Sequence, residues 1–152
     1  MAASTHVYAH AVPDMAGGVG AGTSPNIDWL SDSIYIALVN AYTPNQSAHE
    51  FWSDVVANEV PNGSGYTTNG IVLTGKTLAV ASLVATFDSS LDPTWSGATF
   101  TATHAIIYDR TPASDATRPL IAYIDFGGAL SPVSGSLVIQ FNASGILTAT
   151  VS

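Results

Sequence analysis

The chain has 152 residues, of which 47% are hydrophobic, only 9% are charged and none is cysteine, and its formal net charge is -8. Its basic residues, Lys76, Arg110 and Arg118, are scattered, so they cannot neutralise successive phosphates of a nucleic acid. The acidic balance disfavours docking on anionic membranes, and no apolar run approaches the roughly 18 residues of a membrane-spanning helix. We therefore expect one domain with no nucleic-acid or membrane partner. Its sparse charge suggests that much of its surface is covered by neighbouring subunits, although a Thr-rich monomeric β protein would look the same.

Residues 1–23 are rich in alanine and glycine and are predicted to form an extended or flexible N-terminal arm. Such a segment has little apolar side-chain area to offset the entropy lost on ordering. Two interpretations stay open: a frayed tail, or an arm that orders against a neighbouring subunit. The larger side chains that a plain linker would not need are His6, Val7, Tyr8 and Val12.

Two short helices are predicted in the N-terminal half. The Ser-Pro pair at 24–25 fits an N-cap followed by proline at the first helical position, which would open a helix reaching Leu30. Ser47 and Glu50 have the spacing of a capping box. Apolar residues follow them at helical intervals, which predicts a second helix from about Ala48 to Asn58.

Most of the remaining sequence predicts β-strands. Residues 33–39 are apolar on both faces, as in a central strand covered on both sides. Further strands are expected near 70–76, 77–87, 98–108, 120–126, 137–141 and 146–151. Gly75 is expected to bend the first pair, and residues 142–145 to form the turn of a C-terminal hairpin. The predicted fold is mainly β: residues 24–152 form a single antiparallel β-sandwich or barrel-like domain with one or two short helices and an extended N-terminal arm.

The sequence predicts no catalytic, cofactor or metal site. Asp88 and Asp92 would suit a hard cation, but a calcium loop pattern is absent, and capping of a turn is the simpler interpretation. His104, in mid-strand, is accompanied by no nucleophile signature, which favours a hydrogen-bonded core or interface histidine. Paired carboxylates of a glycosidase could be imagined from Asp109 and Asp125 together with Asp115, but nothing in the sequence fixes their separation. We expect a protein that is not an enzyme.

Surface contacts are expected at aromatic and charged residues near strand ends. Trp95 follows a proline-containing loop and is expected to be exposed, where a sugar could stack on it. This leaves a tail-associated or carbohydrate-binding adhesion module, with a glycan ligand, as an alternative function. The interface candidates are His6, Val7, Tyr8, Val12, Trp95, Asp109, Arg110 and Arg118.

Six runs of the sequence, read in order, carry a family resemblance: NIDWLSDSIYIALVNAYTPN, HEFWSDVVANEV, GYTTNGIVLTGKT, FDSSLDPTWSGATFTATHAIIYDR, PLIAYIDFGG and FNASGILT. The arrangement resembles small virion structural proteins of tailed bacteriophages, commonly placed among head or capsid-decoration proteins. The resemblance covers about residue 26 to the C-terminus and brings no catalytic motif. It implies a non-enzymatic virion protein on the capsid exterior that stabilises the shell. Its implied partners are the major capsid protein and copies of itself, in a homo-oligomer for which a trimer is favoured.

Overall fold

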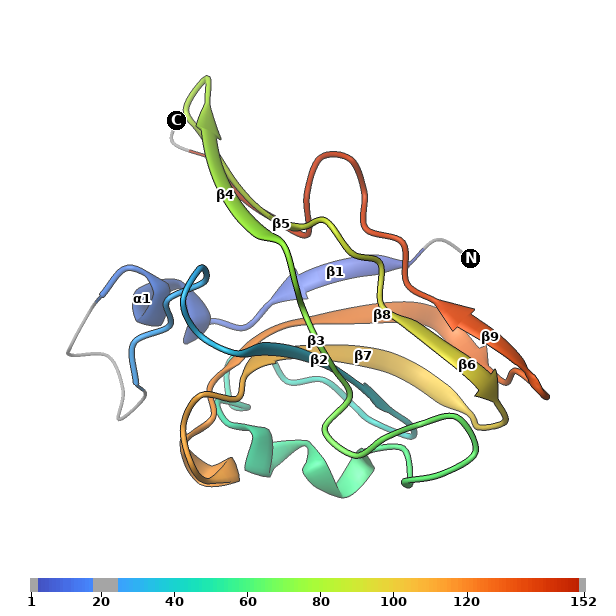
Figure 1. The fold of residues 1–152 in the computed structure, drawn as a ribbon. Helices are drawn as coiled ribbons and strands as arrows, with labels where there is room; N and C mark the ends of the chain where they lie inside the picture. The colour runs from blue at the N-terminus through green and yellow to red at the C-terminus, as the bar shows by residue number, and fades with distance from the viewer. Residues whose placement is uncertain (1–2, 18–24, 151–152) are drawn as a thin grey trace.

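The computed structural model describes residues 3–17 and 25–150, which form a mainly β fold with antiparallel sheets and few short helices (Figure 1). In this part of the chain the strands make a five-stranded sheet in the order β1-β8-β7-β2-β3, a three-stranded sheet in the order β10-β5-β4, and a two-stranded sheet of β6 and β9. The predicted mainly β, sandwich-like fold class is confirmed.

The five-stranded sheet forms the centre of the molecule. Its strands are β1 (Ser4–Val7), β8 (Leu120–Leu130), β7 (Ala102–Asp109), β2 (Ile34–Val39) and β3 (Ile71–Val72). β2 lies between β7 and β3, and all but one of its residues are buried, which confirms the central strand expected from its two apolar faces.

The smaller sheets cover one face of the central sheet, and loops with short 3-10 turns cover the other. The covering strands are β4 (Lys76–Ala81), β5 (Val84–Ser89), β10 (Leu147–Thr150), β6 (Thr94–Ala98) and β9 (Gly135–Val138). Side chains from these strands share one core cluster with alternate residues of β2 and β7, such as Ile36 and Ile107. The other face carries a second cluster, in which the fully buried Trp52 stacks on Tyr108 with 4.3 Å between ring centroids.

Helical structure is shorter than the sequence predicts. The described part of the first predicted helix is a turn, because the Asp28 carboxylate accepts hydrogen bonds from the backbone N–H groups of Leu30 and Ser31. The second predicted helix is replaced by two 3-10 turns, η1 (Trp52–Asp54) and η2 (Val56–Asn58). The remaining helical elements are α1 (Ala11–Met15) and the 3-10 turn η3 (Asp115–Thr117).

The expected capping box is wrong. The Asn45 side chain accepts from the backbone N–H groups of Ser47 and Ala48, and the Asp54 carboxylate accepts from those of Glu50 and Phe51. Competing side-chain acceptors on both sides of this segment hold it in successive turns rather than in one helix.

Two strand assignments also change. Residues 77–87 form not one strand but most of the β4–β5 hairpin, which turns at Ser82 and Leu83. The predicted C-terminal hairpin is wrong, because β9 pairs with β6 while β10 pairs with β5. The turn at residues 142–145 exists, with Gly145 N–H donating to the Asn142 carbonyl, but it carries the chain from one sheet to another.

The N-terminal segment differs from the expected free arm. β1 pairs antiparallel with β8 of its own chain, from Ser4 opposite Asp125 to Val7 opposite Ala122. Tyr8, which follows it, is fully buried. Residues 4–15 are therefore part of the domain, while residues 1–2 and 18–24 of the expected arm lie outside the described residues. Within residues 3–17 and 25–150, no helix is long and apolar enough to cross a membrane.

Candidate interaction surface

The β4–β5 hairpin projects from the body of the molecule and carries β10 along its other side (Figure 1). Its register runs from Lys76 opposite Ser89 to Ala81 opposite Val84. Between Thr77 and Phe87 the sequence holds no charged residue and no proline. The projection is therefore an uncharged element that reaches beyond the body of an acidic protein.

Beyond Lys76 and Ser89 at its base, one face of the projecting sheet is apolar as far as Val80 and Ala85. Leu78 lies opposite Phe87, and Val80 opposite Ala85, so these side chains share a face by the two-residue period of a strand. At the base this face belongs to the core, where Phe87 packs edge-on against Trp29 with ring centroids 5.7 Å apart. Toward the tip the same face leaves the body, and Val80 is 75% exposed.

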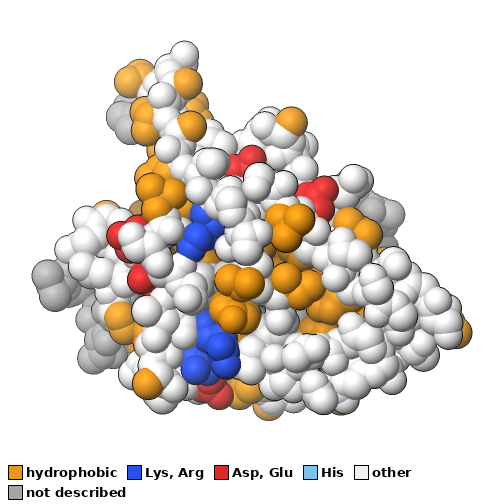
Figure 2. Space-filling view, viewed as in Figure 1, with side chains coloured by type: hydrophobic (Ala, Val, Ile, Leu, Met, Phe, Trp, Pro, Cys, Tyr) orange, Lys and Arg blue, Asp and Glu red, His pale blue; other side chains and the backbone are white. Residues whose placement is uncertain are grey.

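Apolar side chains also surround the base of the hairpin. Val12 of α1 lines a shallow groove of about 240 Å³ with Phe87 and Leu147, and Leu30 lines a neighbouring hollow with Leu78. Figure 2 shows hydrophobic side chains along the projecting hairpin and at its base. We call the exposed apolar residues of this region the hairpin surface; they are Val12, Leu30, Leu78, Val80 and Leu83.

The tip of the hairpin has an unusual backbone. Ser82 and Leu83 have φ angles of +49° and +67°, the left-handed region in which both central residues of a type I′ hairpin turn lie. Asn-Gly or Asp-Gly is the usual solution, because Cβ crowds the following carbonyl oxygen in this region: glycine has no Cβ, and the short polar side chain of Asn or Asp can hydrogen-bond locally. Leu83 is nevertheless 67% exposed, so burial within its own chain offsets little of the cost of this backbone conformation.

The single cation of the hairpin lies at its base. The Lys76 ammonium donates to the backbone carbonyl of Asp32, and burial lowers its pKa. This lysine is held by its own chain, and the residues beyond it toward the tip stay uncharged.

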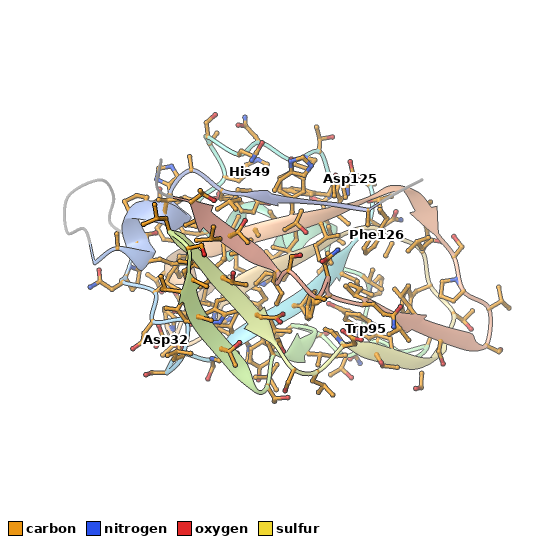
Figure 3. The ribbon with its side chains drawn as sticks, turned by 90° about the horizontal axis from the view of Figure 1, so that it is seen from above. Asp32, His49, Trp95, Asp125 and Phe126 are labelled. Carbon is orange, nitrogen blue, oxygen red and sulfur yellow. The ribbon has the colours of Figure 1, made fainter. Side chains whose placement is uncertain are left out.

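A second feature is a cluster of histidine and tyrosine rings on the other face of the central sheet. The His6 ring stacks on Tyr123 with centroids 4.8 Å apart, and His104 contacts the same tyrosine edge-on. Tyr42 Oη lies 2.6 Å from His49 Nδ1, within hydrogen-bonding distance. Figure 3 shows His49 on the same side of the molecule as Asp125, opposite Trp95 and Asp32.

The geometry around His104 suits a packed histidine. Its Nε2 lies 3.8 Å from Asp125 Oδ1 and its Nδ1 lies 3.0 Å from Thr103 Oγ1. The Thr103 hydroxyl donates to the Val39 carbonyl, so its proton is directed at the backbone and not at the imidazole. Burial lowers the pKa of His104, which keeps its ring neutral at pH 7. In the described ranges, no three His, Asp or Glu side chains are placed to hold a metal ion.

Trp95 is buried, with 3% exposure, which corrects the expectation that it is a surface platform. It lies on β6 opposite Leu137 of β9, and the pairing of these strands turns the indole into the main core cluster. A sugar has no access to a ring in this position.

The charged interface candidates are engaged within the chain. Asp109 is 1% exposed and accepts from the Thr111 backbone N–H, and burial raises its pKa. Arg110 lies over the Tyr35 ring, 5.0 Å from its centroid. Arg118 pairs with Asp115 and donates to loop carbonyls.

The eight predicted interface residues therefore do not form one surface. His6 and Val7 are half-buried in an edge strand and Tyr8 is fully buried, whereas Val12 is 60% exposed and joins the hairpin surface. Sequence reasoning missed the other members, Leu30, Leu78, Val80 and Leu83. The available signal was the uncharged run 77–87, but without a Gly, Asn or Asp at its centre it predicts a single strand.

Comparisons of the chain with protein-family models, with curated proteins and with solved structures found no match.

Proposed function

We propose that this chain is a non-enzymatic structural subunit of a tailed-bacteriophage virion, and that it acts as a capsid decoration protein. In this role it binds the outer surface of the capsid and stabilises the shell through contacts with the major capsid protein and with copies of itself. The observation that carries the proposal is the hairpin surface, a projecting apolar element on a protein with few charges.

The energetics of the hairpin surface favour attachment. Moving one exposed Val or Leu side chain out of water contributes about 1.5–3 kcal/mol before the cost of association is subtracted. A few such contacts suffice when many copies bind a repeating lattice, because each linked contact raises the effective concentration of the next. The net charge of -8 with few basic residues suits the outside of a capsid, away from packaged DNA.

The alternative, a carbohydrate-binding or tail-associated adhesion module, was motivated by an exposed Trp95. That indole is in the core, so the alternative loses its principal stacking residue. We therefore propose the structural role alone.

The test is co-sedimentation with capsids of the phage that encodes the chain, prepared without this protein. We expect the wild-type chain to pellet with capsids, and the double variant Val80→Lys with Leu83→Lys to bind about tenfold more weakly or worse, since it places charge on the hairpin surface. The matched control is Val133→Lys, which changes an 80% exposed valine outside that surface.

Failure of the wild-type chain to bind any capsid preparation would contradict the capsid role. Equal binding by the double variant and the Val133→Lys control would show that attachment does not use the hairpin surface.

A further inference from the structure

β4 presents a free strand edge. It is the outermost strand of the sheet β10-β5-β4, and no strand of residues 3–17 or 25–150 pairs with its outer side. Because the hairpin closes at Ala81 and Val84 around a two-residue turn, the backbone groups of Leu78 and Val80 point away from β5. Phe87 lies opposite Leu78, and its carbonyl likewise points away from β4, where it accepts a hydrogen bond from the Ile146 N–H.

This edge lacks the features that normally prevent strands from pairing between molecules. Proteins usually blunt an exposed edge with charged side chains, proline or a bulge. β4 pairs with β5 without a register shift, and beyond Lys76 it carries only Thr, Leu, Ala and Val. Its unpaired N–H and C=O groups are therefore open to a further strand.

The distribution of charge makes this edge the place where a second copy can approach most easily. Two copies of a chain with net charge -8 repel one another over most of their surfaces. The repulsion is least where neither copy carries charge, and residues 77–87 are such a region. An identical strand running antiparallel is also self-complementary about a two-fold axis.

A register centred on Ala79 fits the side chains. It places Leu78 of one copy opposite Val80 of the other, and the two small Ala79 side chains face each other at the axis. Lys76 then lies opposite Ser82 of the second copy, so the two lysines are kept apart. The tip of each hairpin also reaches the base of the other, where Leu30 is 54% exposed.

We propose that β4 pairs antiparallel with β4 of a second copy of this chain, and that the hairpin surface is the contact that joins the two copies. The inference deepens the proposed function by naming the subunit that the hairpin binds, and it is tested without capsids. It also explains why Leu83 occupies a backbone position better suited to glycine.

The first test is the mass of the purified protein by sedimentation equilibrium, at about 100 µM, where a pair with a Kd below ~10 µM is mostly assembled. We expect a mass twice that of the 15.6-kDa chain for wild type and for Val133→Lys, and the mass of one chain for Val80→Lys with Leu83→Lys. Circular dichroism checks that each variant is folded. A wild-type monomer or trimer, or a double variant that still pairs, overturns the inference.

The second test measures the register by disulfide formation between introduced cysteines. The chain has no cysteine of its own, so no other thiol competes. In Ala79→Cys the two thiols would face each other at a non-hydrogen-bonded pair, where Cα atoms lie close enough for a disulfide. We expect oxidation to link Ala79→Cys into covalent dimers at least about tenfold faster than Ala81→Cys or Val133→Cys, which the register does not place opposite themselves. Equal rates for the three variants would overturn the pairing even if the protein binds capsids.

Discussion

His104 shows how one residue joins parts of the chain that are far apart in sequence. It lies on β7, its ring meets Tyr42 and Tyr123 edge-on, and its Nε2 is 3.8 Å from Asp125 Oδ1. The carboxylate favours the protonated ring, but burial opposes it and has the larger effect, and the nearby His6 adds to the lowering of the pKa. The neutral imidazole is thus the form that the folded protein stabilises.

This lowered pKa predicts a pH-dependent stability. Well above pH 6.5, the ordinary histidine pKa, the ring is neutral in both states and the folded protein keeps its full stability. As pH falls below 6.5 the unfolded chain binds the proton first, so the free energy of unfolding decreases. We expect Tm to fall by a few degrees between pH 6.5 and about pH 5, and to fall less in His104→Gln.

The measurement is a thermal melt at several pH values in one buffer series. Val133→Gln, a change at an exposed residue with no titrating group, serves as the control and should keep the wild-type dependence on pH. An identical decrease of Tm in His104→Gln and wild type would contradict the assignment to His104.

At the scale of the element, the β4–β5 hairpin combines features that work against its own stability. Its turn residues Ser82 and Leu83 both have positive φ, each at a cost of about 1–3 kcal/mol for a residue other than glycine. Val80 and Leu83 gain little burial from the fold of their own chain. Contacts with a partner molecule would offset the backbone cost and bury these side chains.

The turn therefore offers a test that separates stability from association. Replacing the tip by Asn-Gly, as Ser82→Asn with Leu83→Gly, should raise the free energy of unfolding of the single chain by about 1 kcal/mol or more, because these residues suit a type I′ turn. The same change removes Leu83 from the hairpin surface and should weaken self-association by about tenfold.

Denaturant unfolding at low protein concentration measures the first effect, and sedimentation equilibrium measures the second. A variant that is more stable and yet associates as strongly as wild type would show that Leu83 makes no contact between copies.

The whole molecule combines few charges with a projecting apolar sheet. Eleven acidic and three basic residues give the net charge of -8, and no charged residue lies between Thr77 and Phe87. Contacts at this surface depend on burial of apolar area, while long-range electrostatics oppose the approach of two copies.

Salt should therefore strengthen the association of two copies. Raising NaCl from about 50 mM to about 500 mM screens the repulsion between acidic chains, and sulfate further favours apolar burial. We expect the Kd from sedimentation equilibrium to decrease severalfold in NaCl and further in sodium sulfate at the same ionic strength. A Kd that rises with NaCl would indicate that ion pairs hold the copies together.

The fold class and the central strand could be predicted from local sequence, because the alternation and burial of a strand leave a local pattern of apolar residues. The run 33–39, apolar on both faces, became β2 in the middle of the largest sheet. The same local signals gave the bend at Gly75, which has a φ of +61°. They failed for the helices, where Asp28 and Asp54 supply acceptors that favour turns.

The pairing of the strands, and hence the exposure of their side chains, could not be predicted from local sequence. Any β-rich run can pair with any other, so nothing local shows that β10 joins β5 or that β6 joins β9. These non-local pairings bury Trp95, bring His6 and His104 to the same tyrosine, and leave Val80 outside the body. Composition predicted a sparsely charged surface; the fold leaves exposed apolar side chains on the hairpin, because exposure depends on what covers a strand and not on its own sequence.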